Sequence, residues 1–418
     1  MNLMFVIPYV PSLVRVRPYQ FIRSLKARGH RITLATIWTN EQEKEDLNQF
    51  TEFCDEVLAI RLPSYRSLLN CVLALPTQLP LQAKYSWDAQ LWNSVCQRLS
   101  QDDAGKVIDV VHVEHLRGSQ YGVRLKEAAQ RGKIFASRPL SPIVWDSVDC
   151  ISHLFNQAAR QSRQGLKRRI TQFDLQRTER REGWLATFFD QVLVTSEKDR
   201  QALLALASHS AGDPRIDVVP NGVDVDYFQP GPFENREKAT LVVSGKMSYH
   251  ANVNMVLYLV NEVMPMVWRS RPDTQLWIVG KDPGREILSL AKPPSVTVTG
   301  TVPTILPYLQ SATAAVAPIQ YGAGIQNKVL EAMACSTPVI ATSIATSALS
   351  VEPGKDVMIA NTPEEWAACI LDIIASPEKQ KKLGEAGRQF VEKNHRWTEI
   401  ARRLEDIYTT MNHVNHTH

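Results

Sequence analysis

A glycine-rich segment in the second half of the sequence has the residue types of a diphosphate site. Residues 318–342 read PIQYGAGIQNKVLEAMACSTPVIAT, in which an expected strand is followed by two glycines and then by an expected helix. Glycines permit close approach of the backbone to a ligand, and a helix start directs N–H groups and a positive dipole end toward it. Glu331, early in the helix, is placed to bind a ribose diol. The predicted nucleoside-diphosphate site comprises Gly322, Gly324, Ile325, Gln326 and Glu331.

Two lysines follow other expected strands in the same half. Lys246 comes directly after Gly245 and the run ATLVVS, and Lys281 comes after LWIVG. Both emerge at the carboxyl end of a strand, which is where parallel sheets bind ligands. An ammonium group there would stabilise the charge of a departing diphosphate, an effect typically worth several kcal/mol. The alternative for each lysine is an ordinary surface position.

Charged residues also follow the expected strands of the first half. In the run VIDVVHVEHL, strand alternation puts His112 and Glu114 on one face, whereas His115 lies where strand geometry ends. His112 fits a buried structural histidine equally well, while Glu114 and His115 favour a role in the site. Arg15 and Arg17 follow the first expected strand, and a guanidinium group suits phosphate or acceptor binding.

Two aspartates follow a further strand, in the run WDSVDCISHLF. Asp146 and Asp149 there either line the acceptor side of a site or, for Asp149, cap the next helix. No acidic pair of the DxD type occurs in a loop suited to a metal ion, so no metal is expected.

The elements that position these residues alternate between apolar β-branched runs and helical stretches bounded by Gly or Pro. This pattern is typical of βαβ units, and strands that are apolar throughout indicate a parallel sheet covered by helices on both faces. The predicted strands are 3–8, 30–37, 57–62, 107–113, 143–149, 189–196, 239–247, 274–280, 295–300, 314–319 and 338–342. The fold class is therefore α/β with doubly wound parallel sheets.

The length of 418 residues suits two such domains, because single cores rarely grow beyond roughly 250 to 300 residues. The pattern lapses near Ser208 and resumes after the linker VPNGVDVDYFQP, in which Asn221 and Gly222 suit a tight turn. We predict an N-terminal domain at 1–210 and a second domain that begins at 211.

Composition narrows the class of protein. Hydrophobic residues make up 44% of the chain and charged residues 22%, as in soluble globular proteins. The opening MNLMFVIPYV lacks a basic region and runs into prolines, so it predicts a strand instead of a signal peptide, and a cytoplasmic protein. Six scattered cysteines without a CxxC pair predict reduced thiols. A formal net charge of +4 gives no reason to expect nucleic acid as a partner.

The positive charge is concentrated between Arg160 and Arg181, where eight cationic residues accompany only Asp174 and Glu179. This pattern predicts a basic, helical surface. It is either a solvated helix face or a site of peripheral contact with anionic lipid at the inner membrane face or with a phosphorylated acceptor.

The run LEAMA, followed by a small residue and PVIAT, resembles the donor-nucleotide motif of the retaining GT-B glycosyltransferases of family 4, also called group 1. The resemblance spans nearly the whole chain and is strongest over 219–342. It implies two Rossmann-like domains facing a central cleft, the second of them at 211–394. It also implies a terminal helix at about 395–418 that packs back onto the first domain, with Trp397 as a packing anchor.

The resemblance assigns roles to several residues. Glu331 matches the glutamate that holds the ribose, and Lys246 matches the cation that neutralises the diphosphate. Three positions depart from the pattern. Ala323 stands where an earlier glutamate approaches the sugar, Asn252 falls at the position of a second cation, and Leu13 and Val14 replace a glycine pair.

The activity implied is transfer of a hexosyl unit from a nucleoside-diphosphate sugar, with retention of configuration and without a metal or other cofactor. Lys246, Lys281 and the helix start would then do the work of a metal ion, and Glu114 or His115 would orient the sugar or stabilise charge at its C1. The acceptor would be a carbohydrate, a lipid-linked glycan or a small molecule, in exopolysaccharide or other surface polysaccharide biosynthesis.

Three alternatives share parts of this pattern. A GT-B sugar-nucleotide epimerase would have the same architecture, and a degenerate protein would bind the nucleotide sugar without transferring it. A dinucleotide oxidoreductase is disfavoured because no GxGxxG follows the first strand. The sequence does not identify the donor sugar, the nucleobase, the acceptor, the linkage or the oligomeric state.

Overall fold

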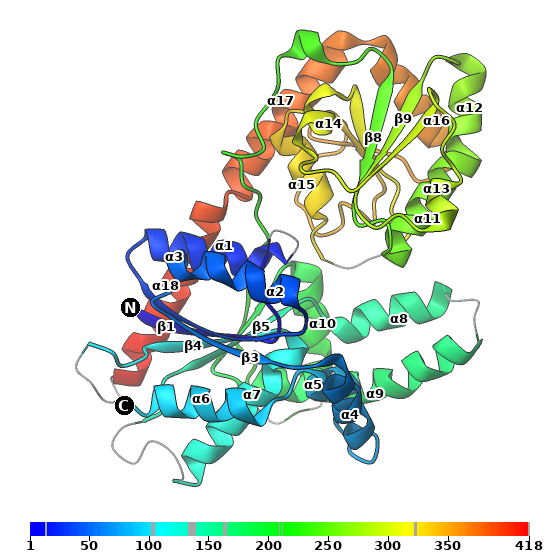
Figure 1. Cartoon of the computed structure of the whole chain (residues 1–418). Helices are drawn as coiled ribbons and strands as arrows, with labels where there is room; N and C mark the ends of the chain where they lie inside the picture. Colours follow the sequence, from blue (N-terminus) through cyan, green and yellow to red (C-terminus); the bar gives the residue numbers. More distant parts are fainter. Residues whose placement is uncertain are drawn as a thin grey trace. The chain divides into compact units, whose positions relative to one another are not determined.

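A computed structural model describes the backbone of residues 1–12, 15–101, 105–132, 139–161, 165–208, 210, 212–321 and 324–416, and it describes side chains over these ranges except at 157–172 and 413–416. The chain forms two compact units, shown in Figure 1. Unit 1 comprises Met1–Pro220 and Thr398–His418, and unit 2 comprises Asn221–Trp397.

Unit 1 is built on a seven-stranded parallel sheet with the order β3-β2-β1-β4-β5-β6-β7. Its strands are β1 (Asn2–Ile7), β2 (Arg31–Trp38), β3 (Glu56–Arg61), β4 (Val110–Glu114), β5 (Ile143–Val148), β6 (Gln191–Val194) and β7 (Ile216–Val218). The strands β4 and β6 are buried along their whole length and β1 from Leu3 onward, because helices cover both faces of the sheet.

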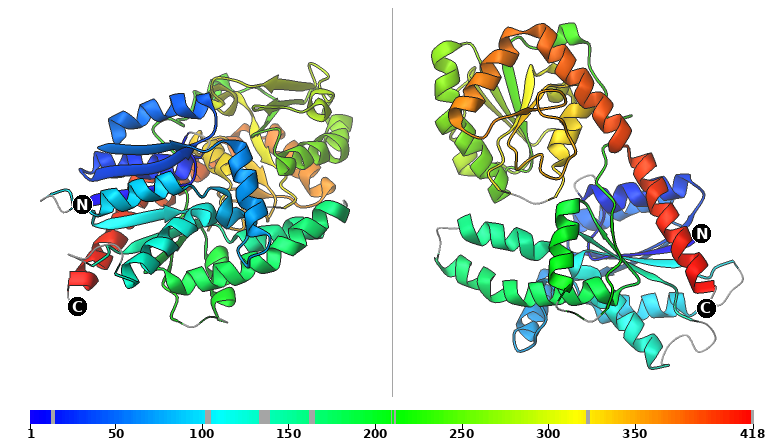
Figure 2. Two further views of the ribbon diagram at one scale, coloured as in Figure 1. Left: turned by 60° about the horizontal axis from the view of Figure 1, so that its bottom comes forward. Right: turned by 180° about the vertical axis from the view of Figure 1, so that it is seen from behind.

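The helices of unit 1 fall into two layers, visible in Figures 1 and 2. One face of β1 packs Met4 and Val6 into a core shared with α6 and α7, while Phe5 faces the layer that contains α1 and α18. The helices are α1 (Val16–Ala27), α2 (Glu41–Asp46), α3 (Phe50–Phe53), α4 (Ser64–Ala74), α5 (Leu81–Tyr85), α6 (Ala89–Leu99), α7 (His115–Gln130), α8 (Ile151–Gln161), α9 (Gly165–Phe188), α10 (Glu197–Ala207) and α18 (Trp397–His416).

Unit 2 repeats this plan with six parallel strands in the order β10-β9-β8-β11-β12-β13. Its strands are β8 (Thr240–Ser244), β9 (Gln275–Val279), β10 (Val296–Gly300), β11 (Ala314–Ala317), β12 (Val339–Ala341) and β13 (Met358–Ile359). Its α-helices are α11 (His250–Tyr258), α12 (Met264–Ser270), α13 (Arg285–Leu288), α14 (Leu306–Ser311), α15 (Asn327–Ala334), α16 (Pro363–Ala375) and α17 (Pro377–Asn394). A π-helical turn (Leu259–Val263) joins α11 to α12.

The predicted α/β class with doubly wound parallel sheets is confirmed, and the eleven predicted strands correspond to β1–β6 and β8–β12. The short strands β7 and β13 were not predicted. Because β7 pairs with β6, the first unit extends to Pro220, beyond the boundary expected at residue 210. The return of the chain to unit 1 begins at Thr398, close to the expected residue 395, and Trp397 is buried.

Both sheets reverse their strand order at one point, between β1 and β4 in unit 1 and between β8 and β11 in unit 2. Ligands of doubly wound sheets bind outside the carboxyl ends of the strands at such switch points. Among the described residues, no helix is long and apolar enough to cross a membrane.

Candidate functional site

The loops after β8 and β9 meet closely at the switch point of unit 2. Gly245 and Gly280 have φ values of +150° and +153°, in the region that favours glycine. A Cβ atom on Gly280 would lie 1.7 Å from the Gly245 carbonyl oxygen, so no side chain fits there. The Met247 amide donates to the Lys281 carbonyl oxygen at 2.9 Å, which ties the two loops together. Glycine at both positions therefore allows the loops to pack against each other.

The segment that follows β11 brings a lysine close to the loops after β8 and β9. The Lys328 ammonium group, on the first turn of α15, donates to Asn252 Oδ1 at 2.6 Å, and Asn252 Nδ2 donates to the Lys246 carbonyl oxygen at 2.9 Å. A Cβ on Gly245 would lie 2.7 Å from Asn252 Nδ2 and 3.2 Å from Lys328 Nζ. Gly245 thus leaves room for the Asn252 amide and the Lys328 ammonium group beside the loop backbone. We call Gly245, Asn252 and Lys328 the ammonium cluster.

Lys328 and Glu331 form a second pair, one helical turn apart on α15. Burial lowers the pKa of Lys328 to about 8, against the attraction of Glu331. Burial also raises the pKa of Glu331 to about 7, against the attraction of Lys328. Both groups therefore titrate near neutral pH, as groups at binding sites often do. A bound anion near Lys328 would favour its charged form.

The start of α15 lies beside these groups. Gln326 is its N-cap residue, Gly324 has a φ of +70°, and Ile325 is buried. The first amides of an α-helix have no acceptor within the helix, so this end suits an anion. Gly322 and Ala323, which the sequence places in this loop, lie outside the described residues.

Of the two predicted lysines, Lys246 is exposed, whereas Lys281 is partly buried like Lys328. Lys246 Nζ lies 3.6 Å from Asp282 Oδ2, and both side chains are at least half exposed. Such an ion pair is weak in water, so Lys246 can turn toward an anion at little cost. Lys281 follows β9 directly and is partly buried. Both lysines lie at the carboxyl ends of their strands, as predicted, and their roles in binding stay predictions.

A tyrosine after β11 is held against α11. Tyr321 accepts or donates a 2.6 Å hydrogen bond with His250 Nδ1, and Asn254 Nδ2 donates to its hydroxyl at 3.1 Å. The rings of His250 and Tyr321 stack at 5.5 Å between centroids. These contacts fix one end of the loop that leads to α15.

The switch point of unit 1 contains a buried charge network. Asp146 accepts from Arg17 Nε at 2.7 Å and from Nη2 at 3.1 Å, and it lies 3.5 Å from His112 Nε2. Burial alone would raise the pKa of Asp146, but Arg17 and His112 outweigh it and hold that pKa at about 2. Arg17 also donates to the Val219 carbonyl oxygen at 2.9 Å. A ligand could reach this guanidinium group only by competing with these partners.

His112 has the environment of a structural histidine. It is 2% exposed, its ring lies 4.8 Å from that of Phe5, and its Nδ1 is 2.7 Å from the Tyr408 hydroxyl of α18. Burial lowers its pKa, against the influence of Asp146, so the ring is neutral. Contact of His112 with an acceptor would require breaking one of these interactions. The buried alternative weighed in the sequence is thus the one that the structure describes.

Glu114 is a buried carboxyl group at the end of β4. The register of β4 and β5 pairs it with Asp146, and Tyr9 forms a hydrogen bond to it. Burial and the Asp146 charge raise its pKa to about 8, so it is largely protonated at neutral pH. Its Oε2 atom has no hydrogen-bond partner among the described residues. A buried polar atom without a partner is costly, which favours a ligand hydroxyl at this position.

His115 follows directly and has a φ of +61°, an unusual conformation for a residue with a side chain. Burial and the neighbouring Arg117 lower its pKa to about 4, so it is neutral at physiological pH. Its carbonyl oxygen accepts from Trp145 Nε1 at 3.3 Å. Strained backbone of this kind is common at functional sites.

The other candidates of unit 1 are placed as follows. Arg15 pairs with Glu43 at 3.1 Å and lies over the Tyr9 ring. Leu13 and Val14 lie outside the described residues. Asp149 does not have the capping role weighed for it, because the Ile151 amide donates to Glu182 instead.

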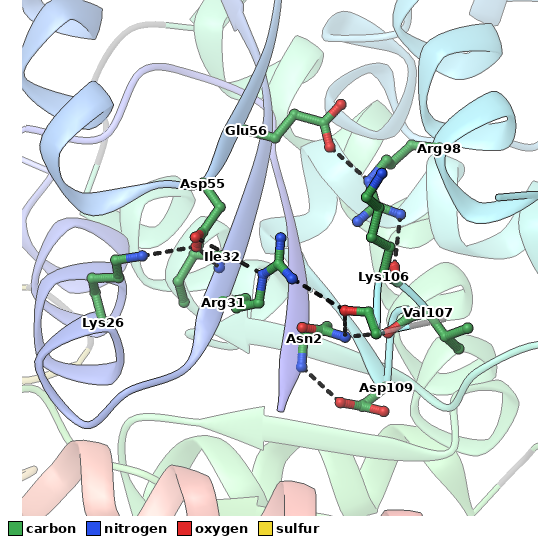
Figure 3. A network of polar contacts seen from close by, with 11 residues as sticks. Asn2, Lys26, Arg31, Ile32, Asp55, Glu56, Arg98, Lys106, Val107 and Asp109 are labelled. Atoms are coloured by element: carbon green, nitrogen blue, oxygen red, sulfur yellow. Dashed lines mark hydrogen bonds and ion pairs between the residues drawn. The ribbon is translucent and has the colours of Figure 1, made fainter. Parts of the chain in front are cut away.

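A hollow of about 270 Å³ lies at the opposite edge of the same sheet, at the amino ends of the strands. Figure 3 shows that its polar groups are bonded to one another. Lys26 pairs with Asp55 at 2.9 Å, and Arg98 pairs with Glu56 at 2.6 Å. This position, remote from the switch point, gives no reason to place the ligand there.

Sequence reasoning missed Lys328, Tyr9, Tyr321 and Tyr408. For Lys328 a signal existed, since it lies three residues before Glu331 and therefore on the same face of the helix. The three tyrosines are identified only by contacts that are distant in sequence.

Comparison with known proteins identifies relatives of part of the chain. Residues 238–376 match the family model described as "Glycosyl transferases group 1". The chain is 27% identical over 228 residues to D-inositol 3-phosphate glycosyltransferase of Segniliparus rotundus, which is 49% of each protein. It is 28% identical over 253 residues to alpha-maltose-1-phosphate synthase of Mycolicibacterium smegmatis, 52% of this chain and 62% of that protein. The matched region spans about half to three fifths of the length of these curated relatives.

Solved structures resemble the whole chain in fold. Sucrose-phosphate synthase of Thermosynechococcus elongatus aligns with a TM-score of 0.65 at 16% identity, covering 98% of this chain and 99% of that one. The Anabaena protein HepE, solved in complex with UDP, aligns with a TM-score of 0.66 at 14% identity, covering 98% and 100%. The resemblance to the group 1 glycosyltransferases predicted from the sequence is confirmed, as is a GT-B fold of two Rossmann-like domains.

Proposed function

We propose that this chain, whose unit 2 matches the group 1 glycosyltransferases, transfers a hexosyl unit from a nucleoside-diphosphate sugar to an acceptor, with retention and without a metal ion. The ammonium cluster is the observation that carries this proposal. A lysine with a lowered pKa lies at a helix start, at a switch point, one turn from a carboxyl group that can bind a ribose. The negative charges of a diphosphate complement this lysine, and the hydroxyl donors of the attached ribose complement the carboxyl group.

The donor binds unit 2 in this proposal. The diphosphate lies against the first turn of α15, where Lys328 supplies positive charge, and Glu331 accepts hydrogen bonds from the ribose hydroxyls. Lys246 and Lys281 extend the positive charge. From the sequence, Lys281 is the candidate to replace the second cation, whose position falls at Asn252. The contact from Lys328 to the Asn252 side chain supports Lys328 as that cation instead.

The reaction breaks the bond between C1 of the sugar and the phosphate oxygen, and that oxygen keeps the electron pair. The acceptor oxygen attacks C1 from the same face, and its proton passes to the departing phosphate. Charge that develops on the phosphate is stabilised by the lysines and the helix start, which are in place beforehand. This chain therefore needs no separate general base.

Unit 1 contributes to the acceptor side. Protonated Glu114 can donate a hydrogen bond to a sugar or acceptor hydroxyl, and neutral His115 can accept one or stabilise positive charge at C1. Burial and the Asp146 charge raise the pKa of Glu114, against the influence of Arg17, and so keep Glu114 protonated. Asp146 is then a positioning residue.

The acceptor in this proposal is a carbohydrate, a lipid-linked glycan or a small polar molecule, in surface polysaccharide biosynthesis at the cytoplasmic side of a membrane. UDP-glucose is the first donor to test, because HepE was solved in complex with UDP-glucose.

The test begins with calorimetric titration of UDP, GDP, ADP and TDP and their glucose conjugates. We expect one nucleotide to bind selectively and Glu331→Ala to weaken it at least tenfold. Glu385→Ala, an exposed glutamate of α17, is the matched control and should bind normally. Folded protein that binds none of the nucleotides would contradict the proposal.

Product analysis then separates the activities. Transfer to an acceptor with the α-configuration of the donor retained supports the proposal. Conversion of the sugar nucleotide without an acceptor would indicate an epimerase, and tight binding without any turnover would indicate a degenerate protein.

A further inference from the structure

Helix α4 of unit 1 carries its apolar residues on the side that faces away from the protein. Among the described residues, eleven large hydrophobic side chains are exposed, and six of them belong to this helix and the residue after it. They are between 46% and 68% exposed. We call this set the α4 face: Tyr65, Leu68, Leu69, Val72, Leu73 and Leu75.

The side of α4 that packs on the protein is small and polar. Ser67 and Ala74 are each 1% exposed. Asn70 Nδ2 donates to the Trp87 carbonyl oxygen at 2.8 Å, and Cys71 Sγ lies 3.8 Å from the Leu81 carbonyl oxygen. Helices at the surface of a soluble protein usually have the opposite arrangement. The reversal is not explained by packing within unit 1, so the face suits an apolar environment outside it.

The neighbouring helix α9 extends this apolar surface. Arg177 Nη2 donates to the Leu75 carbonyl oxygen at 2.8 Å, and its guanidinium carbon lies 4.2 Å from the centre of the half-exposed Phe173 ring. Figure 1 shows α4 at the margin of unit 1, next to α5 and α9. Phe173 thus lies beside the end of the α4 face.

The segment that contains the α4 face is positively charged, and the acidic residues beside it, Asp88 and Asp174, are both buried. Residues 57–87 contain three cationic residues, Arg61, Arg66 and Lys84, and no acidic residue. Arg66 is half exposed and lies 3.6 Å from Asp88. A second copy of the chain, bound face to face, would bring these cations against their own counterparts. An anionic surface with an apolar interior complements both the charge and the apolar side chains.

We propose that the α4 face inserts into the interface of a bilayer containing anionic phospholipids, with the flanking cations on the lipid phosphates. Amphipathic helices bind membranes in this way, with a strength that grows with the buried apolar area and with the anionic lipid content. This surface is separate from the ammonium cluster, so the inference does not depend on the proposed function. It adjoins the basic segment at 160–181 through Phe173 and Arg177, and the side chains of that segment up to residue 172 are not described.

The test is co-sedimentation of the full chain with vesicles of phosphatidylcholine, with and without phosphatidylglycerol. We expect binding to the anionic vesicles only. The double variant Leu69→Gln/Leu73→Gln should lose binding by at least ~10-fold, and Arg61→Gln should lose it by about fivefold, as one cation at a membrane surface contributes. Both leucines are exposed, so the double variant should fold normally and bind nucleotide as the wild type does.

The matched control is Leu288→Gln, since Leu288 of α13 is 50% exposed, within the range of the α4 face, but belongs to unit 2. It should bind vesicles normally. Wild-type binding by the double variant, or equal binding to neutral and anionic vesicles, would overturn the inference. So would a wild-type dimer in sedimentation equilibrium that the double variant abolishes, because the face would then bind a second copy.

Discussion

Replacing Lys328 by Met removes one charge from the ammonium cluster and keeps the length of the side chain. The ammonium group is partly buried and donates to Asn252 at 2.6 Å, so it is fixed in position before any ligand binds. A hydrogen bond that involves a charged group contributes ~1.5–3 kcal/mol, and 1.4 kcal/mol corresponds to a tenfold change in affinity. We therefore expect Lys328→Met to weaken nucleoside-diphosphate binding by about 10- to 100-fold.

The same substitution has two opposing effects on stability. It ends the cost of burying an ammonium ion, but it leaves Asn252 Oδ1 without its donor, which costs about 1–3 kcal/mol. Thermal unfolding of Lys328→Met should therefore show a somewhat lower midpoint than the wild type, with the variant still folded at the temperature of the titration. Loss of binding by a folded variant separates a binding role from a structural one.

The pH dependence gives an independent measurement. The pKa of Lys328 lies near 8, so its positive charge decreases as pH rises through 8, and nucleotide affinity should fall over that interval. Lys328→Met should remove this dependence. Calorimetric titration of the nucleotide at pH 7 and pH 9 checks both effects. The reasoning is refuted if Lys328→Met binds within twofold of the wild type while Glu331→Ala binds weakly.

The remaining predictions concern three other residues. Glu114 holds a proton up to about pH 8 in the folded protein, whereas its ordinary pKa is 4.5. Its contribution to the free energy of unfolding is therefore fully present below pH 4.5, falls as pH rises between these two values and is lost above about pH 8. Glu114→Gln should abolish that decline, gaining at most ~4 kcal/mol near pH 8 in urea unfolding, and an unchanged pH dependence would contradict this. Gly280→Ala should destabilise unit 2 by more than ~2 kcal/mol, because its Cβ overlaps the Gly245 carbonyl oxygen, and normal thermal unfolding would contradict this. Tyr408→Phe should cost about 1 kcal/mol in urea unfolding by leaving His112 Nδ1 without its partner, and an unchanged midpoint would argue against that hydrogen bond.

The sequence predicted the strands well because parallel strands buried on both faces are continuous apolar runs. It placed β1, β4 and β8 within a few residues of their observed bounds. The strand β13 escaped because it has only two residues, and β7 escaped because its three residues have an exposed aspartate, Asp217, in the middle and so form no apolar run. Periodicity also does not tell which face of a helix is buried. The usual assumption is that the apolar face is buried, but in α4 the apolar side chains are exposed.

The sequence predicted the part of the candidate site whose residues lie close together along the chain. Glu331, Gly324 and the start of α15 share one segment, and the sequence brought them together. The contact of Lys328 with Asn252 joins residues 76 positions apart, and the ion pair of Arg17 with Asp146 joins residues 129 apart. Such contacts depend on how strands are ordered in the sheet, which residue spacing does not determine. Even the titration behaviour of Glu114 follows from burial and from strand register.

The path of the chain has a consequence for synthesis on the ribosome. Unit 1 is interrupted between Pro220 and Thr398, so unit 2 is in effect an insertion within it. When unit 2 has left the ribosome it has every residue it needs to fold. The earlier unit must wait, because Tyr408 and the rest of α18 are the last of its residues to be made. A nascent chain that stops before α18 would contain a complete unit 2 and an incomplete unit 1.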